Sequence, residues 1–192
     1  MSVTPNWLQG WESNRMDLLD FEAQSLYFED ELPDEVNALL AAAADAYGSE
    51  SAEHNLLRAH FLEPEHLTVL VALYRYFYYQ HRYRDAFLVA ERAMDITARR
   101  LEIRCTWQRL DLQSLGAGIM KSMTLTRFYL MALKGSGYLK LRLGETDNGL
   151  ARLEKVAELD TDDRMGVLSL VQLARDELRR QELSVHPNVI SL

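Results

Sequence analysis

The sequence predicts an all-α protein, and three observations lead to that prediction. Leu, Ala, Glu and Arg, which favour helices, dominate a chain of 192 residues with only 4 Pro and 9 Gly. Residues 67–96 read as two amphipathic helices joined at residues 80–82. The pattern of small and apolar residues recurs with a period of 34, which is typical of stacked helical hairpins.

Composition excludes several classes of protein. A hydrophobic content of 48% is enough for a sizeable core. No apolar run reaches the roughly 18–20 residues that span a bilayer, and the N-terminus lacks the pattern of a secretory signal. The single cysteine, Cys105, rules out an internal disulfide framework and a cysteine-based zinc site. We therefore expect a cytoplasmic protein without a membrane partner.

Charge is unevenly distributed along the chain, whose net charge is −8. Residues 17–57 hold 11 acidic residues and no Lys or Arg, whereas residues 58–192 hold 20 basic and 17 acidic residues. This asymmetry suggests contacts with a partner or within the protein, with an ordinary solvated surface as the alternative. The basic residues are too dilute to predict nucleic-acid binding.

The first 32 residues form an acidic arm or helix. Trp7 and Trp11 can share one apolar face of a short helix, and Pro33 marks a helix boundary. Two interpretations remain open: a helix packed on the rest of the protein, or a mobile arm whose tryptophans dock on a partner.

Two successive repeats follow, at residues 33–66 and 67–100. Aligned at a spacing of 34, they place small or apolar residues at the same positions, as the inner faces of a helical hairpin require. The matched pairs are Leu39 with Leu73, Ala43 with Phe77, Ala52 with Ala86, Leu56 with Ala90, Ala59 with Ala93, and Leu62 with Ile96.

A third repeat is predicted at residues 130–163. Gly137 takes the small position where helices touch, Gly144 the turn between the helices, and Gly149 the place of Ala86. Residues 164–182 form a final amphipathic helix that caps the array, with Val167, Leu170, Val171 and Ala174 facing inward, and residues 184–192 form a tail.

An insertion of residues 101–129 separates the second and third repeats. We expect the preceding helix to continue to about Arg109, a turn at residues 116–118, and the next helix to begin near Thr124. The role of this insertion stays open.

The pattern resembles the tetratricopeptide repeat (TPR) family, in the form of a small bacterial protein. The matching residues are Leu70, Leu73, Tyr74, Phe77, His81, Tyr83, Ala86, Ala90, Ala93 and Ile96, with Pro64 closing the previous repeat. Tyr74 and His81 depart from the family, which has a small residue and a glycine there. The resemblance implies a TPR-like α-solenoid of about three hairpins over residues 33–183, with an N-terminal segment and a C-terminal capping helix.

In that family the first helix of each hairpin lines a concave groove that binds a partner segment. The corresponding groove residues here are Arg75, Tyr78, Tyr79, Lys134, Tyr138, Arg142 and Arg175. Such a basic, aromatic surface suits an acidic segment with apolar anchors. The alternative is that some of these tyrosines belong to the hairpin core.

No pattern predicts catalysis, a cofactor or a metal. His54, His60 and His66 are six residues apart, which turns their side chains away from one another on a helix. The glycine pairs at residues 116–118 and 135–137 lack the Gly-Lys-Ser/Thr end of a phosphate loop. We therefore expect a protein that is not an enzyme.

The expected function is that of an adaptor or chaperone that binds another protein during assembly of a larger complex or secretion. One alternative is a homo-oligomeric structural module, with Trp7, Trp11 and residues 76–79 as a homodimer face. Another is an accessory protein of nitrogenase or metalloenzyme maturation. A further hypothesis is that acidic residues 17–35 fold over the groove and are displaced by a partner.

Overall fold

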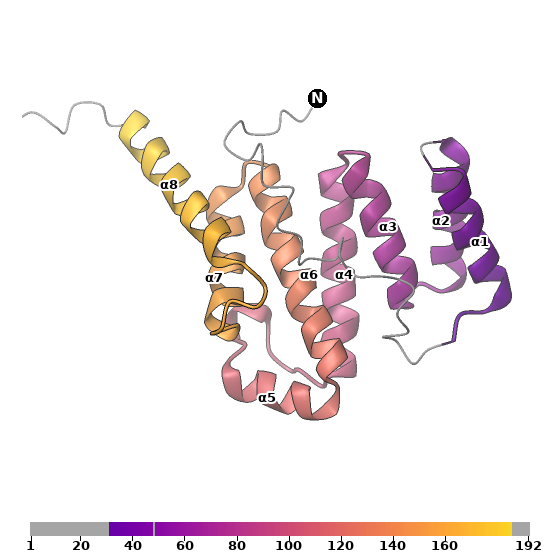
Figure 1. The fold of residues 1–192 in the computed structure, drawn as a ribbon, viewed down its shortest axis with the longest axis horizontal. Coiled ribbons are helices and arrows are strands. Elements are labelled where there is room, and N and C mark those ends of the chain that lie inside the picture. Colours follow the sequence, from indigo (N-terminus) through magenta and orange to yellow (C-terminus); the bar gives the residue numbers. More distant parts are fainter. Residues whose placement is uncertain (1–30, 48, 186–192) are drawn as a thin grey trace, which may run out of the picture.

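The computed structural model describes residues 31–47 and 49–185, and in these residues the chain folds into eight α-helices without a strand. The helices lie in a row in the order of the sequence, except that α5 lies across the lower ends of α6 and α7 in the view of Figure 1. The prediction of an all-α protein is confirmed. The helices are α1 (Asp34–Asp45), α2 (Glu50–Leu62), α3 (Leu67–Tyr79), α4 (Tyr83–Arg100), α5 (Leu112–Lys121), α6 (Met123–Arg142), α7 (Thr146–Leu159) and α8 (Leu168–Val185), with a 3₁₀ turn, η3, at Trp107–Arg109.

The helices pack in sequential pairs. α1 packs on α2, α3 on α4 and α6 on α7, while α2 contacts α3, α4 contacts α6 and α7 contacts α8. Figure 1 shows the same succession. The α4–α6 contact is made directly, although residues 101–122 separate the two helices in sequence. The hydrophobic core therefore runs along the row.

Small residues set the spacing of the first two pairs. Ala52 in α2 and Ala86 in α4 are fully buried, as are Ala59 and Ala90. A methyl side chain lets a neighbouring helix approach closely, whereas larger side chains such as Leu73 fill the space between elements. These residues occupy the interior positions that their spacing in the sequence predicted.

Two glycines bring α6 and α7 into backbone contact. A Cβ atom on Gly149 would lie 2.5 Å from Leu141 Cδ2 and 2.9 Å from the carbonyl oxygen of Gly137. A Cβ on Gly137 would meet Leu153 at 3.1 Å. Gly137 therefore lies where helices touch, as the sequence predicted.

Three helices end in the same type of turn. After α3, α4 and α6, a residue with positive φ follows the helix: His81 (57°), Glu102 (57°) and Gly144 (79°). Backbone N–H groups of the next residues donate to carbonyl oxygens five positions back, from Arg82 to Phe77 (2.8 Å) and from Ile103 to Ala98 (2.9 Å). This is the Schellman hydrogen-bond pattern that satisfies the last carbonyls of a helix.

The predicted course of residues 101–129 is partly wrong. α4 ends at Arg100 rather than near Arg109, because the turn at Glu102 stops it. No glycine marks this turn, so the residues around it carry no stop signal. The expected start of the next helix near Thr124 is confirmed, since α6 begins at Met123 with the Ser122 hydroxyl accepting from the Leu125 N–H.

Residues 116–118 are helical and do not form the predicted turn, because they lie inside α5. The Asp111 carboxylate starts that helix by accepting the Ser114 N–H at 2.7 Å. Gly118 is buried, and a Cβ there would lie 3.1 Å from Thr126 Oγ1 of α6. This glycine serves close packing of α5 on α6.

The last helix begins later than predicted. Residues 164–167 precede α8, because Asp163 has a positive φ of 49° and its carboxylate accepts the N–H groups of Val167 and Leu168. Leu170, Val171 and Ala174 are buried in α8, as expected. The N-terminal tryptophans and residues 186–192 of the predicted tail lie outside the described residues. None of the helices in the described ranges combines the length and the apolar character that a membrane span needs.

Candidate functional site

The seven predicted groove residues differ widely in exposure. Tyr79 on α3 is 49% exposed, Arg175 on α8 is exposed and Arg75 is half-buried. The other four are buried, with 2–8% of their surface exposed: Tyr78, Lys134, Tyr138 and Arg142. Of the seven, only Tyr79, Arg175 and part of Arg75 are therefore accessible at the surface.

Arg142 joins α6 to α4 through aromatic rings. Its guanidinium lies 4.4 Å from the ring centre of Tyr83 and 5.8 Å from that of Tyr138. It donates hydrogen bonds to the hydroxyl groups of both tyrosines. The ring of Tyr78 packs against both as well, with centroid distances of 5.9 and 6.3 Å. This arrangement stabilises the junction of α3, α4 and α6.

Lys134 ties α6 to the segment that leads into α8. Its ammonium group donates to the carbonyl oxygen of Met165 at 2.6 Å, and the side chain is 2% exposed. This charged hydrogen bond gives a partner to a backbone carbonyl of the loop that would otherwise be buried without one.

An exposed aromatic pair lies next to the predicted groove residues. Tyr47, which follows α1, is 54% exposed, and its ring contacts Tyr79 edge-on at 6.4 Å. Tyr47 also contacts Tyr76 at 6.3 Å. Partial burial raises the pKa of the Tyr47 hydroxyl above its usual value of 10.0, and the neighbouring tyrosines add to the effect. Sequence reasoning missed Tyr47, because it lies in a turn and not on a helix face.

A second concave region lies where α5 and α6 meet the loop before α8. The cavity measures about 600 Å³. Its lining combines apolar and charged side chains: Leu115, Ile119, Met123, Thr126, Arg127, Leu130, Leu159, Asp160, Thr161, Asp162, Arg164 and Met165. Nearby, Met120 is 87% exposed. The sequence offered no signal for this cavity, because residues 101–129 have no counterpart in the repeats.

His66 has a local structural role. His66 begins α3, where its Nδ1 accepts the Thr68 N–H at 3.2 Å. Burial lowers the pKa of His60, and the charge of Arg92 lowers it further. No group of three or more His, Cys, Asp or Glu side chains in residues 31–47 and 49–185 is arranged to hold a metal ion.

The fold and these contacts define an all-α protein of sequentially paired helices. The chain is 46% identical over 158 residues to an "uncharacterized 19.8 kDa protein in nifW 5'region" from Azotobacter chroococcum mcd 1. The match covers 82% of this chain and 88% of that protein. The chain belongs to the same family as this uncharacterized protein. No protein-family model and no solved structure matches it.

Proposed function

We propose that the protein is a non-catalytic adaptor or chaperone that binds a segment of another protein, as an accessory factor in assembly of a larger complex or in secretion. In this proposal residues 33–183 form a TPR-like α-solenoid, and the first helices of its hairpins present the binding surface. The helix pairs stack in sequence order, which supports a repeat architecture.

The correspondence between the second and third pairs is the observation that carries this proposal. His81 and Gly144 are equivalent in the alignment, and both have positive φ at the turn within their pair. Ala86 and Gly149 are also equivalent, and both are buried where the two helices of a pair meet. Two unrelated helix pairs have no reason to share turn and contact residues at one spacing. This agreement favours a common repeat unit.

The exposed side chains favour a protein partner. Tyr47 and Tyr79 present rigid aromatic surface, and Arg175 adds a cation on α8, the helix at the far end of the row. Tyr and Arg are enriched at the energetic centres of interfaces. An acidic segment with apolar anchors fits this combination.

Affinity capture from the native host tests the proposal. We expect partners bound by the wild type to be lost or strongly reduced with the double variant Tyr79→Ala/Arg175→Glu. Arg58→Glu is the matched control, because Arg58 and Arg175 are both exposed and each pairs with a glutamate at 2.6 Å. Capture of the same partners by all three proteins would overturn the proposed surface.

Light scattering separates an adaptor from a self-assembling module. A monomer supports the adaptor. A dimer that does not dissociate on dilution, and that Tyr79→Ala disrupts, supports the homo-oligomeric alternative. Of the residues predicted for that face, Trp7 and Trp11 lie outside the described residues, and among residues 76–79 only Tyr79 is exposed.

A second candidate function is that of an accessory protein in nitrogenase or metalloenzyme maturation. The name of the relative, which refers to the 5' region of nifW, is the observation that favours it. Deleting the gene of that relative should then slow growth on dinitrogen but not on ammonium. Equal growth on both nitrogen sources would contradict this candidate.

A further inference from the structure

A small cavity of about 270 Å³ lies between α4, α6 and the segment before η3. It is separate from the predicted groove residues and near the lower end of the size range of ligand pockets. Its volume suits one amino-acid side chain better than a cofactor. Its lining includes Met94, Asp95, Cys105, Trp107, Gln108 and Tyr129.

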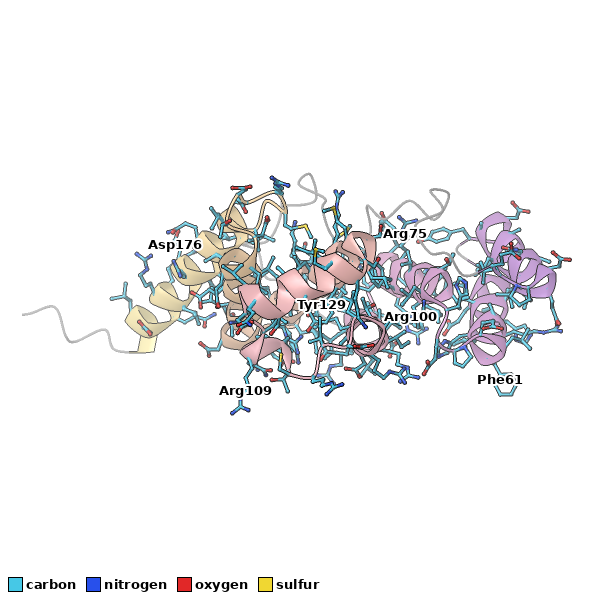
Figure 2. The ribbon with its side chains drawn as sticks, turned by 90° about the horizontal axis from the view of Figure 1, so that it is seen from below. Phe61, Arg75, Arg100, Arg109, Tyr129 and Asp176 are labelled. Carbon is cyan, nitrogen blue, oxygen red and sulfur yellow. The ribbon has the colours of Figure 1, made fainter. Side chains whose placement is uncertain are left out.

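Tyr129 contributes a buried hydroxyl to this cavity. The side chain, labelled in Figure 2, is 3% exposed. Its hydroxyl makes no hydrogen bond with another described residue. Burial raises the pKa of Tyr129 far above 10.0, with further contributions from Cys105 and Glu91. The group therefore stays a neutral phenol that can both donate and accept. A polar group at this depth is expected to have a partner.

The charged side chains that line the cavity are both acidic. Glu91 and Asp95 lie one turn apart on α4, and no Lys or Arg is among the lining residues. Arg152 of α7, which does not line the cavity, pairs with Glu91 at 2.7 Å, and its guanidinium lies 4.8 Å from the Trp107 ring centre. Asp95 has no ion pair with another described residue.

We propose that this cavity binds an organic cation, a guanidinium or ammonium group at the end of a flexible chain. The Asp95 carboxylate accepts its N–H groups, and the Tyr129 hydroxyl accepts a further one. Trp107 and Met94 contact the aliphatic stem. An arginine or lysine side chain of a protein and a free polyamine share this chemistry. The inference stands apart from the proposed adaptor function, because it uses none of the groove residues.

Cys105 provides a chemical probe of ligand binding in the cavity. It is the single cysteine of the chain and lines the cavity, so alkylation by neutral iodoacetamide reports whether the cavity is filled. The probes are N-acetyl-argininamide, spermidine, and N-acetyl-citrullinamide as the neutral control of the same shape. Amide NMR shifts of Gln108 and Tyr129 provide a second readout that does not depend on thiol reactivity.

We expect argininamide or spermidine to slow alkylation saturably and to shift both amides, and citrullinamide to do neither. Asp95→Asn should raise the half-saturating concentration of the cation about tenfold or more, because the variant loses one charged hydrogen bond. Asp45→Asn, an equivalent change on α1, should leave it unchanged. Because Asp95 and Asp45 are both exposed, neither variant endangers the fold.

The two sources of the cation give different results. Saturation by argininamide and not by spermidine assigns the cavity to a protein side chain, and the reverse assigns it to a free polyamine. Three results would overturn the proposal: no saturable effect of either cation in both readouts, an equal effect of citrullinamide, or an unchanged half-saturating concentration in Asp95→Asn.

Discussion

Arg152 of α7 donates to both carboxylate oxygens of Glu91 of α4, at 2.7 and 3.1 Å. The same guanidinium donates to Ser136 Oγ of α6 at 2.8 Å. One side chain thereby connects three helices that belong to two successive pairs. Two planar groups that meet through two hydrogen bonds fix each other's orientation as well as their separation.

Replacing Arg152 by Leu should lower the free energy of unfolding by about 2 kcal/mol. The Arg152 side chain is 9% exposed and that of Glu91 is 33% exposed, so removal leaves a partly buried carboxylate without its partner. Arg58→Leu breaks a 2.6 Å ion pair between side chains that are 56% and 57% exposed. It should cost less than about 1 kcal/mol. Urea denaturation measures the free energy of unfolding of both variants. Equal losses would show that the Arg152–Glu91 pair contributes no more to stability than an exposed ion pair.

Two glycine substitutions should have opposite effects. Gly149→Ala places a methyl group 2.9 Å from the backbone oxygen of Gly137 and should destabilise by about 1–3 kcal/mol, although alanine favours helix. Gly116→Ala, inside α5, meets nothing within 4 Å and should stabilise by about 0.5–1 kcal/mol. Thermal unfolding followed by circular dichroism tests the pair. A stable Gly149→Ala protein would mean that α6 and α7 can separate at no cost.

Gly144→Ala should cost about 1–2 kcal/mol for a different reason. Gly144 has a φ of 79°, and a Cβ there would meet nothing within 4 Å, so the cost is conformational and not steric. Gly144→Asn should lose less, because asparagine tolerates this backbone region better. The free energies of unfolding of the two variants test this prediction. A larger loss for Gly144→Asn than for Gly144→Ala would contradict a cost that comes from the backbone conformation.

Acid should weaken the ion pairs around Glu65. A hydrogen bond from Arg99, together with the charges of Arg99, Arg92 and Arg100, holds the pKa of the Glu65 carboxyl below its ordinary value of 4.5. Its folded-state pKa is depressed, so the stabilisation is fully present above pH 4.5 and is lost as pH falls through the lowered pKa. We expect Glu65→Gln to destabilise the protein at about pH 6 and to have little effect at about pH 3.

Denaturation curves of the wild type and of Glu65→Gln at both pH values test this prediction. The difference at the higher pH should also shrink in high salt, because Glu65 is exposed and its ion pairs with Arg92 and Arg99 are screened. A stability difference between the wild type and Glu65→Gln that grows as the pH falls would contradict the lowered pKa of Glu65 as its cause.

The helix pairs were predictable from the sequence because their interior residues recur at fixed spacing. Ala52 and Ala86 are matched alanines, and both are fully buried. Helix ends were predictable where a residue with special backbone freedom marks them, as Gly144 does. The end of α4 was not, because Glu102 adopts the same left-handed conformation without any such signal.

The surface was harder to predict than the core. The position in the repeat predicted both Tyr79 and Arg142 as groove residues. In the structure Tyr79 is 49% exposed, whereas Arg142 is 6% exposed. Arg142 is buried because Tyr83 and Tyr138 surround its guanidinium, and such a tertiary contact has no local pattern. Tyr129 and Asp95 line one cavity for the same reason: separate helices bring them together.

The order of the helix contacts has a consequence for how the protein forms. Most principal contacts join a helix to the one just before it, so the mean sequence separation of contacting residues is small and rapid folding is expected. A growing chain can pack each pair as soon as both of its helices have left the ribosome. The contact of α4 with α6 is the exception, because residues 101–122 must first close into a loop. Its closure entropy makes the union of the first two pairs with the third the expected slow step in folding.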